Sequence, residues 1–177
     1  KAIGGRGDGK ALWSNDGGAT WNVATGLTTG GRVETAYAPS AASTTYASVE
    51  NGNGELWKST DGGQSYTLMN TAAGYLDGQG WYDNVVWVSP TDANFAIVGG
   101  IDLWKTVNGG TTLTKISNWQ QGGGYGPSAH ADHHVITAHP SYNGTSNTTV
   151  FFGNDGGIYR ATDVTTVGNN PTAYTAG

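Results

Sequence analysis

The stretch Leu56-Trp57-Lys58-Ser59-Thr60-Asp61-Gly62-Gly63-Gln64-Ser65-Tyr66 predicts a strand, a tight polar turn and a second strand. Aromatic residues flank the turn, and its two glycines can adopt the positive φ angles that a reversal between two strands needs. The Asp61 carboxylate can accept hydrogen bonds from N–H groups of the turn and so fix its shape. The sequence therefore predicts a β-hairpin that is organised by Asp61.

The same pattern recurs along the chain, and its leading residues are 44, 47 and 55 positions apart. A period in the forties that is built from short strands is typical of a β-propeller, with one blade per repeat. We therefore expect Asp16, Asp61 and Asn108 to be structural turn residues. The other copies are Leu12-Trp13-Ser14-Asn15-Asp16-Gly17-Gly18-Ala19-Thr20-Trp21, the weaker Leu103–Leu113 with Asn108 in place of Asp, and Ile158–Asp163, which lacks the Gly-Gly pair.

A second marker supports the repeat independently of the turns. Ala38-Pro39, Ser89-Pro90 and His139-Pro140 each end a strand-like run, and the prolines are 51 and 50 positions apart. The runs before them predict the innermost strands, and Trp13, Trp57, Trp104 and Tyr159 are expected at equivalent positions of the third strands. The predicted strands are Val33–Ala38, Asn84–Ser89 and His133–Ala138 (first), Thr45–Val49, Phe95–Val98 and Val150–Gly153 (second), and Ser65–Met69, Thr112–Ile116 and Ala173–Thr175 (fourth).

These patterns predict an all-β protein made of β-propeller blades of four antiparallel strands, with about four repeats. A single propeller region covers 1–177, with approximate blades at 1–30 (partial), 31–73, 74–127 and 128–177 (partial). Lys1–Gly4 matches the second strands, so the first blade is expected to lack its innermost strand. We expect an arc of a larger propeller, whose remaining blades would be its partners. A complete four-bladed disc is the alternative.

The repeated Ser/Thr-x-Asp-x-Gly-x-x-Trp/Tyr pattern resembles the Asp-box, or BNR repeat, of sialidase-like propellers. A broader set of segments is similar to secreted bacterial BNR-repeat proteins, which are often called glycosyl hydrolase-like. The resemblance implies an extracellular or cell-surface location and leaves the substrate open; no signal peptide is expected at Lys1. The segments are Gln79–Asp83, Val98–Trp104, His130–His134 and Gly153–Gly157.

Composition narrows the partners. The chain has 177 residues, 30 of them glycine, and only 12% are charged, which fits one turn-rich β core. A net charge of −5 argues against nucleic acid as a partner, and no apolar run is long enough to insert into a membrane. The absence of cysteine excludes disulfides and thiolate metal sites. No cofactor is expected.

Aligning the repeats on their prolines predicts a ligand site. Arg32, Asp83 and His133 stand seven residues before the three prolines, at the start of the predicted innermost strands and hence at one mouth of the channel. The loops that enter the same rim carry exposed-looking aromatic residues beside amides and carboxylates, which suits sugar rings. The alternative is that these aromatic residues cap the core. They are Trp81 and Tyr82 in one loop, and Trp119 and Tyr125 in the other.

Glycoside hydrolysis needs two carboxyl groups on opposite sides of a cleft, one protonated and one ionised. The candidates are Asp83, Glu34, Asp132 and Asp155. The run Gly153–Arg160 resembles the stretch around a catalytic Asp in xyloglucan-cleaving propeller hydrolases, and this resemblance implies a catalytic role for Asp155. Sialidase chemistry is less favoured, because it needs an arginine triad and an Arg-Ile-Pro motif, and the motif is absent.

Two hypotheses follow. The first is a module that binds carbohydrate or a protein partner at the channel rim. The alternative is part of a glycoside hydrolase that uses paired carboxylates, xyloglucanase-like rather than sialidase-like. They differ in whether two carboxylates face each other across a cleft.

The segment His130-Ala131-Asp132-His133-His134 is the densest set of potential metal ligands. Imidazole and carboxylate groups together suit a divalent ion such as zinc. If this run is extended, His130, Asp132 and His134 share one face. We expect no metal, however: His134 would pack between blades, Asp132 would hold an imidazole or a loop amide, and the polar cluster would order the loop from Asn118 to Ala129.

Overall fold

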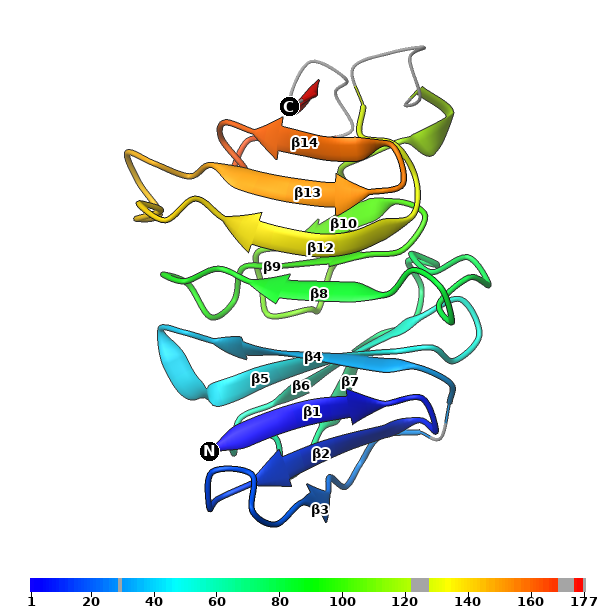
Figure 1. Cartoon of the computed structure of the whole chain (residues 1–177), viewed down its shortest axis with the longest axis vertical. Helices are drawn as coiled ribbons and strands as arrows, with labels where there is room; N and C mark the ends of the chain where they lie inside the picture. Colours follow the sequence, from blue (N-terminus) through cyan, green and yellow to red (C-terminus); the bar gives the residue numbers. More distant parts are fainter. Residues whose placement is uncertain (29, 122–127, 169–173, 177) are drawn as a thin grey trace.

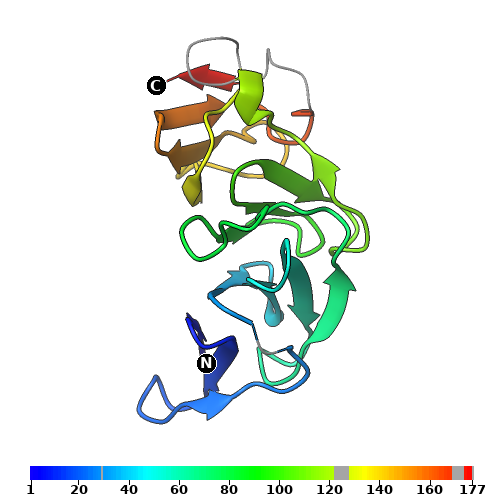
Figure 2. The same ribbon diagram turned by 90° about the vertical axis from the view of Figure 1, so that its right-hand side faces the viewer.

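The computed structural model describes residues 1–28, 30–121, 128–168 and 174–176. It contains four antiparallel β-sheets, which follow one another along the long axis of the molecule in the order of the sequence (Figure 1). The view turned by 90° shows the sheets as successive layers (Figure 2). This linear succession is what consecutive copies of one structural repeat produce.

Each sheet is a meander in which strands that are consecutive in the sequence pair with each other. The all-β class and the four-stranded antiparallel blades are therefore confirmed, although the first sheet has three strands. The strands are β1 (Ala2–Arg6), β2 (Lys10–Ser14) and β3 (Asn22–Val23) in the first sheet; β4 (Val33–Ala38), β5 (Ala41–Val49), β6 (Glu55–Ser59) and β7 (Thr67–Asn70) in the second; β8 (Val85–Val88), β9 (Ala96–Gly99), β10 (Leu103–Thr106) and β11 (Thr114–Lys115) in the third; and β12 (His133–Ala138), β13 (Val150–Asn154), β14 (Gly157–Ala161) and β15 (Tyr174–Ala176) in the fourth.

Two of the predicted innermost strands, β4 and β12, have the predicted bounds, whereas β8 is shorter by one residue at each end. The described part of the chain contains one helical element, the short 3-10 helix η1 (Trp119–Gln121). None of the helices among the described residues is long and apolar enough to cross a membrane.

The first strands of the second, third and fourth sheets define one edge of the stack. β4, β8 and β12 lie side by side, run in the same direction, and are in contact from sheet to sheet (Figure 1). The residues that precede or begin them, Arg32, Asp83 and His133, therefore lie toward one common edge. We call this edge the rim.

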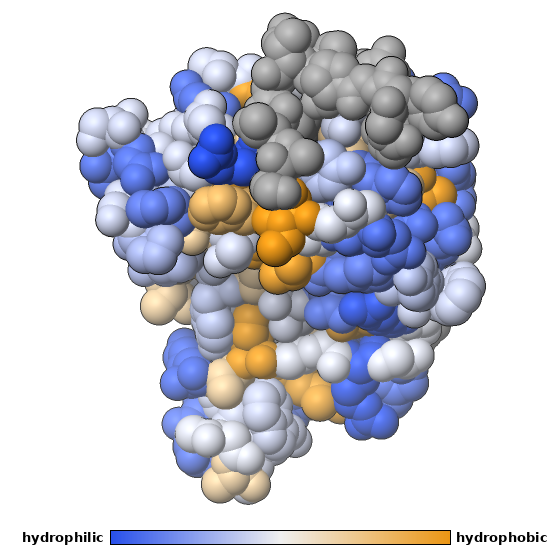
Figure 3. Space-filling view, turned by 45° about the horizontal axis from the view of Figure 1, so that its top comes forward, coloured by the Kyte–Doolittle hydropathy of each residue, from blue (hydrophilic) through white to orange (hydrophobic). Residues whose placement is uncertain are grey.

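Hydrophobic clusters hold neighbouring sheets together. Between the first and second sheets, Ala11 of β2 packs with Val33 and Trp57. Tyr46 and Leu56 of the second sheet pack with Val98 of the third. The largest cluster joins the third and fourth sheets. On the face shown in Figure 3, most of the hydrophobic surface lies in a central band of patches between broader polar areas.

The Asp61 turn shows how its sequence fixes a hairpin. Gly62 and Gly63 have φ angles of 81° and 89°, which only glycine adopts without strain. Asp61 Oδ1 accepts hydrogen bonds from the N–H groups of Gln64 and Ser65, at 2.9 and 3.0 Å. Burial opposes ionisation here, but the hydrogen bonds from Ser59 and Ser65 hold the pKa of Asp61 well below its usual range. The turn is thus built around an ionised carboxylate.

The other two turns follow the same plan with fewer bonds. Asp16 accepts one backbone hydrogen bond, from the N–H group of Thr20 at 2.9 Å. Asn108 also accepts one, from the N–H group of Thr112 at 3.0 Å. The side chain that precedes each turn, Ser14 or Thr106, bonds to the Asp16 or Asn108 side chain.

The expected equivalence of Trp13 with the other third-strand aromatic residues is wrong by one position. Ser14 and Ser59 play the same role in their turns, but Trp13 directly precedes Ser14, whereas Lys58 separates Trp57 from Ser59. The first copy is one residue shorter between its Trp and its Asp, so Leu12 is the true counterpart of Trp57. Accordingly, Ala11 is buried, as Leu56 and Leu103 are in the later sheets: Leu56, Leu103 and Ala11 expose 1% or less.

Candidate functional site

The rim carries a hydrogen-bonded network whose side chains come from three successive sheets and the turns that lead into them. Arg32, before β4, donates from Nη1 to the carbonyl oxygen of Tyr82 at 2.7 Å and from Nε to Glu34 at 2.7 Å. The Tyr82 hydroxyl donates to Asp155 Oδ2 at 2.9 Å. His134 Nε2 lies 2.7 Å from the other Asp155 oxygen. The network therefore connects the second, third and fourth sheets.

Asp155 is the ionised carboxylate of this network. Hydrogen bonds from His134 and then from Tyr82 lower its pKa. The Tyr82 ring also meets the His134 ring edge-on, with centroids 5.0 Å apart. Asp155 is half-exposed, so it is charged, positioned and open to solvent at the same time.

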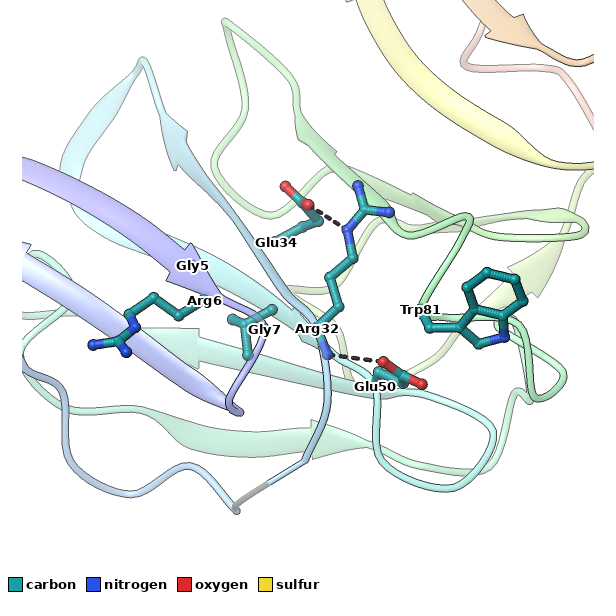
Figure 4. A pocket seen from close by; sticks show the side chains of 8 residues that line it. Gly5, Arg6, Gly7, Arg32, Glu34, Glu50 and Trp81 are labelled. Atoms are coloured by element: carbon teal, nitrogen blue, oxygen red, sulfur yellow. Dashed lines mark hydrogen bonds and ion pairs between the residues drawn. The ribbon is translucent and has the colours of Figure 1, made fainter.

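Trp81 stands beside this network and is 67% exposed. Its ring lies 5.7 Å from that of Tyr82. On its other side is a groove of about 440 Å³. The close-up in Figure 4 shows the Arg32 guanidinium group directed toward Glu34, with Trp81 at one side of the groove and Arg6 extending away at the other. The groove is lined by Gly5, Arg6, Gly7, Arg32, Val33, Glu34, Glu50 and Trp81.

The charges in the groove are largely compensated. Arg32 pairs with Glu34, and its backbone N–H donates to Glu50 Oε2 at 2.8 Å. Arg6 pairs with Asp8 at 3.2 Å. An exposed indole ring beside neutralised polar groups suits a neutral, hydroxyl-rich ligand better than a strongly charged one.

Asp83 differs from the other acidic candidates because it is completely buried. Neither of its carboxyl oxygens has a hydrogen-bond donor among the described residues. Burial, followed by the neighbouring Asp132 carboxyl group, raises the pKa of Asp83 above its ordinary range. Burial thus favours the protonated form of Asp83, and the buried carboxyl group cannot touch a ligand at the surface.

His133 is likewise completely buried, and both of its ring nitrogens lack a partner among the described residues. Burial, followed by the nearby His134 and His130, lowers the pKa of His133 to about 3. Its backbone N–H donates to the Gly100 carbonyl oxygen at 2.9 Å, which ties the fourth sheet to the third. The neutral ring lies in the interior and not on the ligand surface that the proline alignment predicts.

The remaining candidates fall in different places. Trp119 begins η1 and is 49% exposed, but it does not line the groove beside Trp81. Tyr82 is 40% exposed, so none of the three described aromatic candidates is buried as a cap of the core. Tyr125 lies outside the described residues. Of the carboxylates, Asp155 and Glu34 reach the surface of the rim.

The predicted geometry of the histidine cluster is wrong. Asp132 has a φ angle of 64°, so the run from His130 is not extended and β12 starts only at His133. His133, and not His134, is the residue that packs between the sheets, while His134 is exposed and bound to Asp155. Among the described residues, no group of three or more His, Cys, Asp or Glu side chains could hold a metal ion.

Two features of the site escaped the sequence analysis. Glu50 enters the groove from the turn after β5, and nothing in its local sequence distinguishes it from a solvated residue. The pairing of His134 with Asp155 joins residues 21 positions apart and depends on the sharp turn at Asp132. That turn could have been suspected, since Asp tolerates the left-handed region better than most residues.

No protein-family model matches this sequence, and no curated protein does. Solved structures do resemble it. A GH74 enzyme of Niastella koreensis superposes with a TM-score of 0.64 at 20% identity, over 97% of this chain and 22% of that enzyme. An ancestral GH74 enzyme gives 0.62 at 17% identity, over 89% of this chain and 20% of the enzyme. The GH74 xyloglucanase of Xanthomonas campestris gives 0.64 at 14% identity, over 97% and 27%.

At these identities the likeness shows the fold. The chain has a GH74-like propeller fold, and it spans about a fifth to a quarter of the length of the enzymes that it matches. The similarity of fold does not assign the activity of those enzymes to this chain, because one fold supports many functions.

Proposed function

We propose that this chain is an extracellular Asp-box β-propeller module that binds a neutral polysaccharide across Trp81, Tyr82 and Arg32 at the rim. One observation carries the proposal: Trp81 is 67% exposed and stands between a compensated polar groove and the Tyr82–Asp155 network. A large aromatic ring held in water at such a place can stack on the C–H face of a sugar, while Arg32 and Asp155 bond its hydroxyl groups.

The structural similarity to GH74 enzymes supports the choice of ligand. One of the similar structures is named a xyloglucanase, and a polysaccharide chain is long enough to run from the groove past Trp81 to Asp155. The assignment of the Asp16 and Asp61 turns to the Asp-box type, and the extracellular location with it, rest on the resemblance of the repeated motif and on the carboxylate-to-backbone bonds within the turns. Xyloglucan oligosaccharides are therefore the first probe.

Calorimetric titration of the protein with xyloglucan oligosaccharides tests the proposal. We expect Trp81→Ala to weaken binding by about fivefold to a hundredfold, because stacking of a ring on an aromatic side chain contributes about 1–3 kcal/mol, as for nucleic acid bases. Trp119→Ala is the matched control, since Trp119 is also an exposed tryptophan but lies outside the groove. Equal loss in both variants, or binding of a protein partner in place of any glycan, would overturn the proposed site.

A glycoside hydrolase is the second candidate. The favourable observation is that two carboxyl groups near the rim have pKa values displaced in opposite directions, raised for Asp83 and lowered for Asp155. The complete burial of Asp83 opposes it, because a general acid must reach the glycosidic oxygen. Release of reducing sugars from xyloglucan, abolished by Asp155→Asn, would establish this candidate over pure binding.

A further inference from the structure

Glu50 is the groove residue whose charge is not compensated by a cation. It directly follows β5 and lines the groove together with Trp81. Both arginines of the groove form ion pairs with other carboxylates, and none of the ion pairs within the described part of the chain includes Glu50. Glu50 Oε2 accepts a hydrogen bond from the backbone N–H of Arg32 at 2.8 Å, whereas no described group donates to Oε1. Oε1 can therefore accept a hydrogen bond from a ligand.

The backbone and two glycines hold Glu50 in place. Its N–H donates to the Arg32 carbonyl oxygen at 2.8 Å, and its carbonyl oxygen accepts the N–H of Gly31 at 2.6 Å. A Cβ atom at Gly31 would collide with Glu50 Oε2, and a Cβ atom at Gly80 would lie 2.9 Å from Glu50 Cγ. Neither glycine has a positive φ angle, so both positions require the absence of a side chain and not an unusual backbone. The Glu50 side chain thus has little conformational freedom to lose on binding.

This fixed carboxylate lies beside the exposed ring of Trp81. Gly80 directly precedes Trp81, so the Glu50 side chain packs against the backbone that carries the indole ring. Figure 4 shows one Glu50 oxygen directed at the Arg32 backbone and the other turned toward the side on which Trp81 stands. A sugar that stacks its C–H face on the ring holds its hydroxyl groups around the edge of the stack. A carboxylate accepts a hydrogen bond from such a hydroxyl group more strongly than a neutral oxygen does.

We propose that Glu50 determines which glycans bind at Trp81. Its Oε1 accepts the hydroxyl hydrogen of a neutral sugar that stacks on the indole ring, and its unpaired charge repels glycans that carry carboxylate or sulfate groups. This inference rests on the proposed function and adds to it a specificity-determining residue, which touches the ligand but does not supply the stacking surface.

The exclusion of acidic glycans follows from the charges around the groove. A bound uronic acid would bring its carboxylate close to that of Glu50, and like charges that meet in a partly buried site are strongly unfavourable. The guanidinium groups of Arg6 and Arg32 are already paired with Asp8 and Glu34, so an acidic sugar would have to break one of these pairs to gain a cation. A hydroxyl group needs no such rearrangement.

Calorimetric titration of the parent and of Glu50→Gln tests the proposal, with xyloglucan oligosaccharides as the neutral probe and oligogalacturonate as the acidic one. Glutamine keeps the size of the side chain and an acceptor for the Arg32 N–H, but it removes the charge. We expect Glu50→Gln to bind the neutral probe about fivefold to tenfold more weakly, because a hydrogen bond to a charged group is stronger than a neutral one by that factor. The same variant should bind oligogalacturonate more tightly than the parent does.

Two further variants separate charge from position. Glu50→Asp keeps the charge but shortens the side chain, so it should lose affinity for the neutral probe and still reject the acidic one. Asp77→Asn is the control for net charge, because Asp77 is exposed in the loop that leads to Trp81 but does not line the groove. Asparagine also tolerates the φ angle of 42° at this position. Asp77→Asn should leave both affinities unchanged.

Three results would overturn the proposal. The first is equal affinity of parent and Glu50→Gln for both probes. The second is a parent that binds oligogalacturonate as tightly as xyloglucan oligosaccharides. The third is an Asp77→Asn variant that changes both affinities as Glu50→Gln does, which would assign the selectivity to net charge alone. In each case a loss of binding in Trp81→Ala would still support the proposed function, whereas a parent that binds no glycan would overturn both.

Discussion

The Asp61 turn and the Asp83 site use the same side chain in opposite ways. Asp61 receives two backbone N–H groups and the hydroxyl groups of Ser59 and Ser65, so it is ionised and fully bonded. Asp83 is completely buried and has no hydrogen-bond donor among the described residues, and burial raises its pKa. One carboxylate completes a local structure, and the other is held in place by sheets that are far apart in the sequence.

The difference separates the parts of the molecule that repeat from the part that does not. The turns satisfy their polar groups locally, so each copy can form by itself and its sequence recurs. At the rim, the side chains of Asp83 and His133 have no hydrogen-bond partner within the described part of the chain, and such groups concentrate at functional sites. The three predictions below test this contrast, in order of decreasing effect.

Replacement of the buried His133 tests whether this residue lowers the free energy of unfolding. The pKa of His133 is about 3 in the fold and about 6.5 in an unfolded chain, so the fold loses stability as pH falls below about 6.5. His133→Leu removes this loss. We expect the variant to gain about 2 kcal/mol relative to the parent when the pH is lowered from neutral to about 5.

Chemical denaturation at the two pH values measures that gain. His139→Leu is the control for the loss of a histidine, because His139 directly follows the same strand, β12. If the parent and His133→Leu respond equally to acid, the imidazole is not held neutral, and the contrast between rim and turn is weaker than the structure indicates.

Removal of the Asp61 carboxylate from its turn should lower the stability of the fold, whereas replacement of His133 should raise it in acid. Asp61→Ala leaves the N–H groups of Gln64 and Ser65 without their acceptor, and we expect a loss of about 1 kcal/mol, as for other side-chain caps. Because the pKa of Asp61 is lowered, its contribution is present above the ordinary carboxyl pKa and is lost as pH falls below it. Thermal or urea unfolding at neutral and acid pH checks both statements, and an Asp61→Ala protein as stable as the parent contradicts them.

The smallest effect is expected at the third turn. Asn108→Asp introduces a charged acceptor for the N–H and hydroxyl groups of Thr112. Asp61 already accepts the equivalent groups of Ser65. We expect a gain of about 0.5 kcal/mol at neutral pH, which disappears in acid. A loss would show that the amide N–H of Asn108, which donates to the Thr112 hydroxyl, matters more than the charge.

The sequence predicts the parts of this molecule that depend on local chemistry. The Asp61 turn, the bounds of β4 and β12, and the all-β class follow from residue types at short spacing. The equivalence predicted for Trp13 was wrong because it was based on the conspicuous Leu12-Trp13 pair. The contact between Ser14 and Asp16, which sets the register of the repeat, is less visible in the sequence.

At the rim the sequence predicts which residues gather and not what each one does. The proline alignment brings Arg32, Asp83 and His133 to one edge, but it does not reveal that two of them are buried. Their burial depends on how neighbouring sheets pack. The left-handed φ angle of Asp132, which exchanges the orientations expected for His133 and His134, is likewise a consequence of tertiary structure.

The bond between the Tyr82 hydroxyl and Asp155 spans 73 positions and crosses from the third sheet to the fourth. Its evolutionary consequence is specific. Duplicating or inserting a blade elsewhere in such a propeller would leave this bond intact, whereas a new blade between these two sheets would separate its ends. A single sheet copied to another place would carry only one end. The rim site is thus inherited as an adjacent pair of blades, and the number of blades can change around that pair but not within it.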